Sequence, residues 1–305
     1  MVIRRCRILA LLVLVLSQST SVLAAENLVS IDHVMDIEGY GDSRLSLPTD
    51  VAVTKGQVAV VDSGHDRVSI FNDEGEFLFH IGHKGSSPGE FRAPVGIDSD
   101  KAGYLFVADT GNHRIQIFSD TGKFMDSFPV MEEGRAIRPI DVVVDENREV
   151  IYVTGNNNHK VMAFGPKGKL LHSWGGNGIG REEFRYPATL TLMADDRLGI
   201  VDVLNTRLQV YSRRGDFVIQ IGGWGVLPGQ FFRPKGVAFE DARVYVSDSY
   251  MQAIQVFADT GAFLHLLKPS DPEHAVETPT GIDVEAGRLY VSEMTANKVS
   301  VFELN

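Results

Sequence analysis

The sequence predicts an all-β protein, a six-bladed β-propeller built from four-stranded antiparallel blades. A twelve-residue pattern, two strands around a polar turn, recurs with its third residue spaced 45 to 47 residues apart. The six copies occupy residues 60–71, 107–118, 153–164, 200–211, 246–257 and 291–302. A fixed period of this length, with no helical periodicity inside it, is typical of propeller blades.

Each period also supplies a strand before the pattern and a strand after it. The first strand is a short apolar run opened by a proline, as in "PTDVAV" from Pro48 and "PIDVVV" from Pro139. The last follows a turn, as in "DEGEFLFHIG". Four strands per period predict blades at about 47–91, 92–137, 138–184, 185–231, 232–277 and 278–305.

The sixth blade is incomplete, because the sequence ends at Asn305 just after its third strand. Residues 28–46 align with the fourth strand and interblade connection of the other periods. We therefore expect a strand near His33 to Ile37 to pair with "VSVFEL" (299–304) and close the ring, which removes exposed sheet edges.

The first 24 residues are typical of a secretory signal peptide. Arg4, Arg5 and Arg7 precede a short apolar run and a small-residue cleavage pattern ending at Ala24. The sequence thus predicts export to the periplasm or the extracellular space, with residues 25–305 forming one propeller domain. The single cysteine, Cys6, lies in the leader, so no disulfide is expected.

Charge and hydropathy limit the partners. The net charge is −11, and an acidic chain repels phosphate backbones, so nucleic acid is not expected as a partner. No stretch after the leader approaches the roughly 20 apolar residues of a membrane-spanning helix. We expect a monomer unless the protein joins a complex.

Three features resemble the NHL-repeat family in its exported bacterial type. They are the pattern "VADTGNHRIQIF", the "P-x-G" opening of inner strands, and the loop "IGGWGVLPGQFFRPKGV". The resemblance extends over residues 28–305 and implies a six-bladed propeller. It implies no single activity, because one fold hosts many functions.

The repeated acid and base of the turn have a structural interpretation. Asp62 and Arg67, Asp109 and Arg114, and Asp202 and Arg207 stand at the same positions in three blades. A pair that recurs in this way is expected to tie the turn to its surroundings by charge-assisted hydrogen bonds. The third blade has Gly155 in place of the acid, and the fifth has Ala253 in place of the base.

Catalytic and metal-binding residues find little support. The peptidyl-hydroxyglycine lyase propeller, which this chain resembles in repeat type, binds zinc through channel histidines, whereas none of the six inner-strand runs contains a histidine. No His-x-x-x-His motif or cysteine cluster exists. We therefore expect no catalytic residue, no protein-bound metal and no cofactor from these motifs.

The channel mouth is an exception that leaves two interpretations open. Two residues after the opening proline, three blades carry Asp50, Asp141 and Thr189, where the others carry glycine. The carboxylates could hold a cation or a basic peptide group, or they could cap local backbone amides.

One face of the disc is the expected binding surface. The turns between second and third strands and the interblade connections emerge on the same side, and they carry His65, Asp66, His113, Asn157, His159, Trp224 and Tyr250. Tryptophan and tyrosine often anchor protein contacts. The sequence thus favours a non-catalytic exported propeller that binds a protein or peptide of the cell envelope, as a scaffold or sensor. The alternative is a metal-dependent lyase or hydrolase at the channel mouth.

Overall fold

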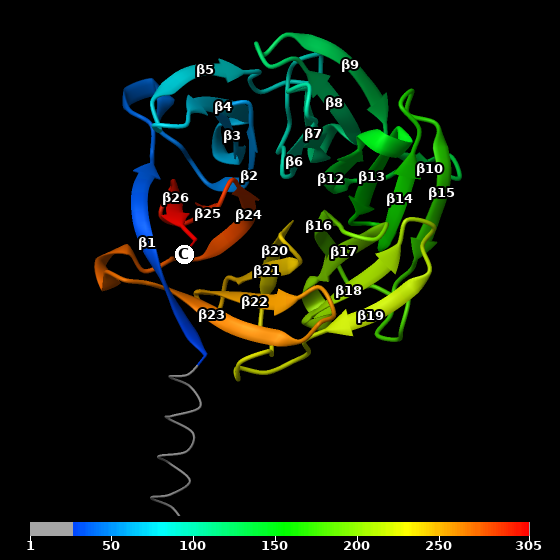
Figure 1. Cartoon of the computed structure of the whole chain (residues 1–305). Helices are drawn as coiled ribbons and strands as arrows, with labels where there is room; N and C mark the ends of the chain where they lie inside the picture. The colour runs from blue at the N-terminus through cyan, green and yellow to red at the C-terminus, as the bar shows by residue number, and fades with distance from the viewer. Residues whose placement is uncertain (1–26, 305) are drawn as a thin grey trace, which may run out of the picture.

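The computed structural model describes residues 27–304, and these form a closed six-bladed β-propeller (Figure 1). The predicted leader and Cys6 lie outside the described residues. Inner strands surround the centre of the disc and outer strands form its rim (Figure 1). Within the described range, no helix has the length and apolar character needed to cross a membrane.

The first three blades follow one another along the chain. Blade 1 comprises β2 (Pro48–Thr54), β3 (Gln57–Asp62), β4 (Arg67–Asn72) and β5 (Phe77–Ile81). Blade 2 comprises β6 (Ile97–Ser99), β7 (Leu105–Asp109), β8 (Arg114–Phe118) and β9 (Phe124–Pro129). Blade 3 comprises β12 (Pro139–Asp145), β13 (Val150–Gly155), β14 (Lys160–Phe164) and β15 (Leu170–Gly175). A small hairpin of β10 (Met131–Glu132) and β11 (Arg135–Ala136) is inserted between blades 2 and 3.

The remaining blades complete the ring. Blade 4 comprises β16 (Pro187–Met193), β17 (Arg197–Asp202), β18 (Arg207–Ser212) and β19 (Phe217–Ile221). Blade 5 comprises β20 (Pro234–Glu240), β21 (Arg243–Asp248), β22 (Ala253–Ala258) and β23 (Phe263–Pro269). Blade 6 comprises β24 (Pro279–Glu285), β25 (Arg288–Glu293), β26 (Lys298–Glu303) and, as its outer strand, β1 (Leu28–Ile37).

Strand β1 closes the ring as the sequence predicts. It pairs antiparallel with β26, with Ile37 opposite Val299. Its first residues also pair in parallel with β23, with Leu28 opposite Leu266, so blades 5 and 6 form one eight-stranded sheet. The predicted fold class is therefore confirmed, and the second pairing adds a link between neighbouring blades that the repeat alone does not indicate.

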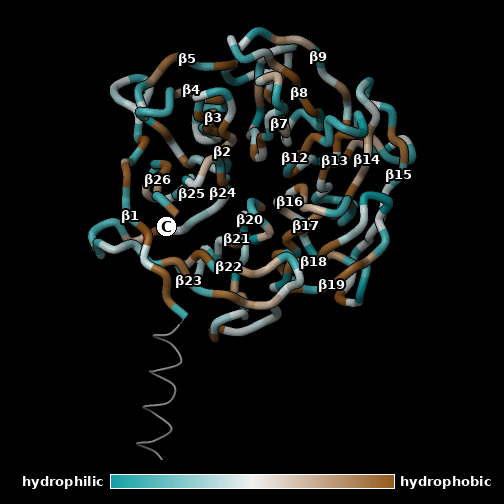
Figure 2. The backbone as a smooth tube through the Cα atoms, in the orientation of Figure 1, coloured by the Kyte–Doolittle hydropathy of each residue, from teal (hydrophilic) through white to brown (hydrophobic). Residues whose placement is uncertain are grey.

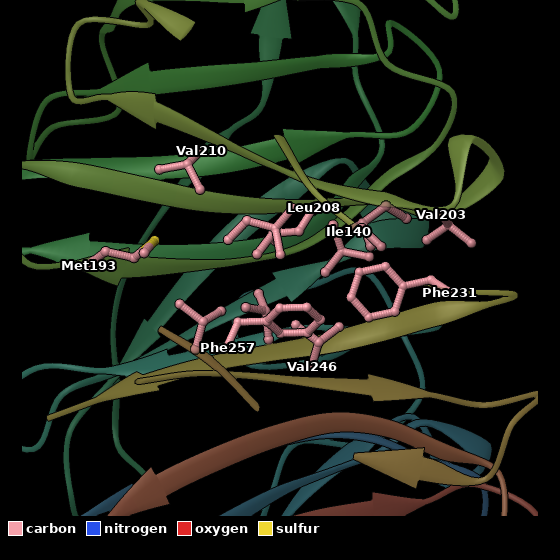
Figure 3. Packing of buried hydrophobic residues seen from close by; sticks show 13 residues of the cluster. Ile140, Met193, Val203, Leu208, Val210, Phe231, Val246 and Phe257 are labelled. Carbon is pink, nitrogen blue, oxygen red and sulfur yellow. The ribbon is translucent and has the colours of Figure 1, made fainter. Parts of the chain in front are cut away.

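The hydrophobic core lies between blades. Hydrophobic stretches run along the strands, and hydrophilic ones mark the connecting turns (Figure 2). Blades 4 and 5, for example, share a cluster that includes Leu208, Val210, Phe231, Val246 and Phe257 (Figure 3). Each sheet buries both faces against its neighbours, which explains the runs rich in valine and isoleucine in the middle strands.

Residues 27–304 contain six 3-10 turns, and all of them are short. They comprise η1 (Gly41–Ser43), η2 (Ser63–His65), η3 (Thr110–Asn112), η4 (Glu146–Arg148), η5 (Val203–Asn205) and η6 (Pro272–His274). In blades 1, 2 and 4 the turn between the second and third strands is one of these, η2, η3 or η5.

Candidate functional site

The signature turns are structural, as the sequence suggests. In blade 2 the buried carboxylate of Asp109 accepts from Arg114 Nε at 2.7 Å and from the backbone N–H of Arg92 at 2.8 Å. The same guanidinium donates to the carbonyls of Ser87 and Glu90 in the preceding connection. The pair thus ties each turn to the interblade connection beside it.

Blades 1 and 4 repeat this arrangement. Asp62 accepts from Arg67 Nε at 2.7 Å, and Asp202 accepts from Arg207 Nε at 2.9 Å. All three aspartates are inaccessible to solvent, so they are unavailable to a partner.

Most of the polar residues predicted for the binding face are engaged in similar local bonds. The Asp66 carboxylate accepts from the N–H of Ala93, and Asn157 accepts from the N–H of Arg138. The N–H of Tyr186 donates to His159 Nδ1 at 3.2 Å, and His65 Nδ1 lies 2.9 Å from the Asp62 carboxylate. These side chains hold the connections in place.

Three of the predicted face residues have other surroundings. His113 adopts a positive φ of 57° at the end of its turn, and its Nδ1 is buried without a hydrogen-bond partner in the described structure. Tyr250 stacks on Phe232 with ring centroids 4.0 Å apart and stays 58% exposed. Trp224, in the connection between β19 and β20, is 74% exposed.

Exposed apolar side chains gather around Trp224 and Tyr250. Within residues 27–304, the large apolar side chains that are more than half exposed are Tyr40 and a group that we call the apolar patch. The apolar patch consists of Ile179, Leu204, Trp224, Val226, Leu227 and Tyr250. All six come from the turns of blades 4 and 5 or from the connections that lead into these two blades.

The structure brings the segments of this patch together. The Asn205 side chain, next to Leu204, donates to the carbonyl of Gly178, next to Ile179. Val203 and Phe231 belong to one core cluster and lie near each other at its end (Figure 3). Trp224 forms a β-bridge to Phe231, so the Trp224 connection and the Leu204 turn are neighbours.

The Trp224 connection does not need its exposed apolar side chains in order to fold, because an equivalent connection adopts the same conformation with polar ones. Three connections share one conformation, with bridges between Lys84 and Phe91, Asn177 and Phe184, and Trp224 and Phe231. In each, the phenylalanine is fully buried and anchors the connection. The first connection exposes Lys84, Ser86 and Ser87 where the third exposes Trp224, Val226 and Leu227. Polar residues therefore build this loop equally well, and the apolar ones are available for binding.

The central channel is a second candidate. A cavity of about 60 Å³ is lined by Asp50, Asp98, Asp141 and Asp283, with Thr189 and apolar inner-strand residues beside them. This is room for little more than one or two water molecules or a bare ion. No histidine lines it.

β-Bulges near the start of the inner strands direct two of these carboxylates into the channel. The pairing register shifts between Pro48 and Val51 in blade 1 and between Pro139 and Val142 in blade 3. Asp50 and Asp141 lie in these bulges, which redirect side chains at strand ends. The predicted channel residue Thr189 lies in the matching bulge of blade 4, where its hydroxyl donates to the carbonyl of Lys235.

Each channel carboxylate accepts a hydrogen bond from a backbone N–H of the next blade around the ring. Asp50 accepts from Ile97 and Asp141 from Leu190, both at 3.0 Å. Asp98 accepts from Val144 at 2.7 Å, and Asp283 from Val53 at 2.8 Å. Both interpretations of the channel mouth therefore have a basis, because the carboxylates cap amides and also line a common cavity.

None of these four carboxyl groups has a cationic partner, and the pKa of each lies above the ordinary value for aspartate. Burial is the main cause: it raises the pKa of Asp98 to about 8, that of Asp141 to about 7 and that of Asp283 to about 6. Burial and the charge of Asp141 hold the pKa of Asp50 well above its ordinary value. Oδ1 of Asp141 has no hydrogen-bond donor unless Asp50 carries a proton. Burial thus favours protonated carboxyl groups in the channel, and a bound cation would reverse that preference.

Sequence reasoning missed Asp98 and Asp283. They follow the bulge position by two residues in blades 2 and 6, where strand alternation places them on the same side as Asp50 and Asp141 but deeper in the channel.

Comparison with known proteins supports the fold. A family model described as a 6-bladed beta-propeller, DUF5128, matches residues 14–126. A gluconolactonase from Xanthomonas campestris superposes with a TM-score of 0.67 at 15% identity, covering 91% of this chain and 95% of that one. A streptogramin B lyase superposes with a TM-score of 0.65 at 13% identity, covering 89% and 97%. At such identities the likeness is one of fold.

Curated relatives share part of the sequence. Peptidyl-glycine alpha-amidating monooxygenase B of Xenopus laevis is 29% identical over 178 residues, which is 54% of this chain and 20% of that protein. Protein brain tumor of Drosophila melanogaster is 26% identical over 132 residues, which is 42% of this chain and 12% of that protein. The chain thus corresponds to a fifth or less of either relative.

Proposed function

We propose that this protein is an exported propeller of the NHL type that binds a protein or peptide of the cell envelope through the apolar patch and has no catalytic role. The observation that carries the proposal is the contrast between equivalent connections. The Trp224 connection exposes apolar side chains where the Lys84 connection exposes polar ones. Exposed apolar groups gathered at one place on an otherwise polar surface are typical of interaction sites.

The composition of the patch suits a peptide or loop with apolar side chains. Trp224 and Tyr250 supply rigid aromatic area, and Val226 and Leu227 extend it. The rim is a poorer surface for such a partner, because its large apolar side chains on the outer strands, such as Leu171 and Phe77, are at most half exposed. The patch is therefore the binding surface of choice.

The test is site-specific photocrosslinking in cells that express the full chain. A photoreactive residue at Val226 should yield one dominant crosslinked partner, and Trp224→Ala should reduce its yield about tenfold or more, since loss of a buried aromatic anchor costs roughly 2 kcal/mol. Tyr40 provides the matched control, because it is an exposed aromatic side chain in the connection between blades 6 and 1, two blades away from the Trp224 connection. Tyr40→Ala should leave the crosslink and the melting temperature unchanged.

Two outcomes would contradict the proposal. Equal crosslinking in wild type and Trp224→Ala would mean that the patch is not the contact surface. Capture of a partner by a photoreactive residue placed at position 40, with none captured at position 226, would move the site to blades 6 and 1.

A second function is supported by the channel. Four carboxyl groups share a small buried cavity without a positive side chain, and one oxygen of Asp141 lacks a donor. We infer that the channel can hold a divalent cation such as calcium, whose oxygen ligands would be these aspartates. Such a cation could be structural, or it could serve the alternative activity, a metal-dependent lyase or hydrolase reaction at the channel mouth. Either role makes the stability of the protein depend on calcium and on pH.

A further inference from the structure

A cluster of metal-ligating side chains lies outside both candidate sites, where the ring closes. His33 and Asp36 lie on β1, and His274 lies in η6, within the connection between blades 5 and 6. One ligand atom from each of the three lies within 4.8 Å of the others. All three residues are half-buried, so the cluster is sheltered but accessible to an ion.

The carboxylate of this cluster is held in place by its neighbours. Asp36 Oδ1 lies 2.9 Å from His33 Nε2 and accepts from Ser300 Oγ at 2.7 Å. The other oxygen, Oδ2, accepts from Lys298 Nζ at 2.9 Å. Burial opposes ionisation of Asp36, but the hydrogen bonds from His33, Ser300 and Lys298 outweigh it and lower the pKa. The carboxylate is therefore an anion, and its lysine contact lies on the oxygen away from His33.

The two imidazoles lie against each other. The rings of His33 and His274 are stacked, with centroids 3.6 Å apart and an angle of 4° between their planes. Nitrogen lone pairs lie in the plane of each ring, so one ring must turn about its side-chain bonds before both nitrogens face one metal. The His274 ring makes no hydrogen bond within the described residues, and its contact is the stack on His33. Its nitrogen atoms are thus available to a ligand.

We propose that His33, Asp36 and His274 form a binding site for a divalent transition metal, with zinc as the best match. Two imidazoles and one carboxylate are a common zinc ligand set that leaves a further position for water. Ser300 and Lys298 fix the carboxylate from outside, as supporting hydrogen bonds do in known metal sites.

The position of the site gives the metal a structural consequence. Strand β1 supplies the outer edge of blade 6, and η6 lies in the connection that leads into the same blade. A metal bound to both would join the N-terminal strand to that connection at the closure of the ring. This proposal is independent of the apolar patch and of the channel.

The experiment measures zinc binding by calorimetry and by thermal unfolding, on protein without a histidine tag. We expect about one zinc per chain and a rise of about 5 °C in melting temperature at zinc concentrations about 100 times the dissociation constant. His274→Gln should weaken zinc binding at least tenfold and reduce the rise at the same zinc concentration to about half or less. Because His274 lies in a connection, this variant should melt within a few degrees of wild type when zinc is absent.

Two controls make the result specific. His83→Gln removes a histidine whose side chain is 77% exposed and distant in sequence from the cluster, and it should bind zinc like wild type. His172→Gln removes a histidine on the outer strand β15 of blade 3, and it should also leave zinc binding unchanged. Undiminished zinc affinity in His274→Gln, or no binding by wild type at neutral pH, would overturn the site.

Discussion

Two groups of aspartates in this propeller, one buried and one buried or half-buried, differ in what neutralises them. In the signature turns, Asp62, Asp109 and Asp202 each meet the Nε of an arginine at 2.7 to 2.9 Å. In the channel, Asp50, Asp98, Asp141 and Asp283 meet backbone amides and one another. The charge of each turn aspartate is balanced by its arginine. The channel aspartates have no such partner, so a proton or a cation would stabilise them.

The difference follows from symmetry. A turn aspartate lies beside its own blade's third strand, so in blades 1, 2 and 4 the copy of the repeat that supplies the aspartate also supplies its arginine. The channel is shared by all six blades, and its inner strands bring several acids together without a base. Repetition therefore produces self-sufficient sites at the periphery and an unbalanced charge at the centre, which is where an ion has most to contribute.

The largest expected effect comes from breaking a turn pair. Asp109→Ala leaves the Arg114 guanidinium and the Arg92 N–H without their acceptor, and removal of one partner from a buried pair costs about 3 kcal/mol. Denaturant unfolding should show this loss in the free energy of unfolding. Asp126→Ala, on the exposed outer strand of the same blade, should change it by less than about 0.5 kcal/mol. Equal stability of the two variants would refute the structural role of the turn pair.

The sequence predicts the periphery of this molecule better than its centre and its closure. The spacing of Asp62, Asp109 and Asp202 is visible along the chain, and so is the missing strand that β1 supplies. Asp98 and Asp283 could have been found from strand alternation, because each lies two residues after the position that Asp50 occupies in blade 1. The proximity of His33 and His274 could not, because it depends on how an inserted connection folds against the first strand.

The same limit applies to the binding surface. The repeat predicts that Trp224 and Tyr250 share a face with His65 and Asn157, but it does not distinguish which polar side chains bind their own backbone. Only the local contacts show that Asn157 holds the Arg138 N–H while Trp224 is free. Exposure of Leu204 and Ile179 beside Trp224 likewise depends on packing between blades.

An intermediate effect is expected from the channel, and it depends on pH. The folded-state pKa of Asp98, about 8 because of burial, lies above the unfolded value of about 4. The protonated group therefore contributes stability that is complete below about pH 4 and is lost as the pH rises through about 8. Asp98→Asn keeps an acceptor for the Val144 N–H and cannot ionise. Asp98 is half-buried rather than fully buried, so solvent screens part of the shift. The variant should therefore be more stable than wild type by about 1 to 2 kcal/mol at pH 8, and the difference should shrink towards pH 5.

Calcium should reverse this order if the channel binds it. With calcium at pH 8, wild type should gain stability. Asp98→Asn should gain less, because the variant lacks one of the carboxylates that would bind calcium. The measurement is thermal unfolding of both proteins from pH 5 to pH 8.5, with calcium or with a chelator. A difference between the proteins that is independent of pH would mean that Asp98 ionises normally in the folded state.

The smallest effect is expected from restoring a missing arginine. In blade 5, Ala253 replaces the base, and the buried Asp248 accepts instead from four backbone N–H groups, those of Phe232, Arg233, Tyr250 and Met251, at 2.7 to 3.0 Å. Its oxygens are already satisfied, so Ala253→Arg should raise the free energy of unfolding by less than about 1 kcal/mol. The measurement is denaturant unfolding of Ala253→Arg and Asp109→Ala side by side, so that the two changes in the free energy of unfolding can be compared. A gain as large as the loss in Asp109→Ala would show that four amides do not replace a guanidinium, and the turn of blade 5 would then belong with the under-neutralised aspartates of the channel.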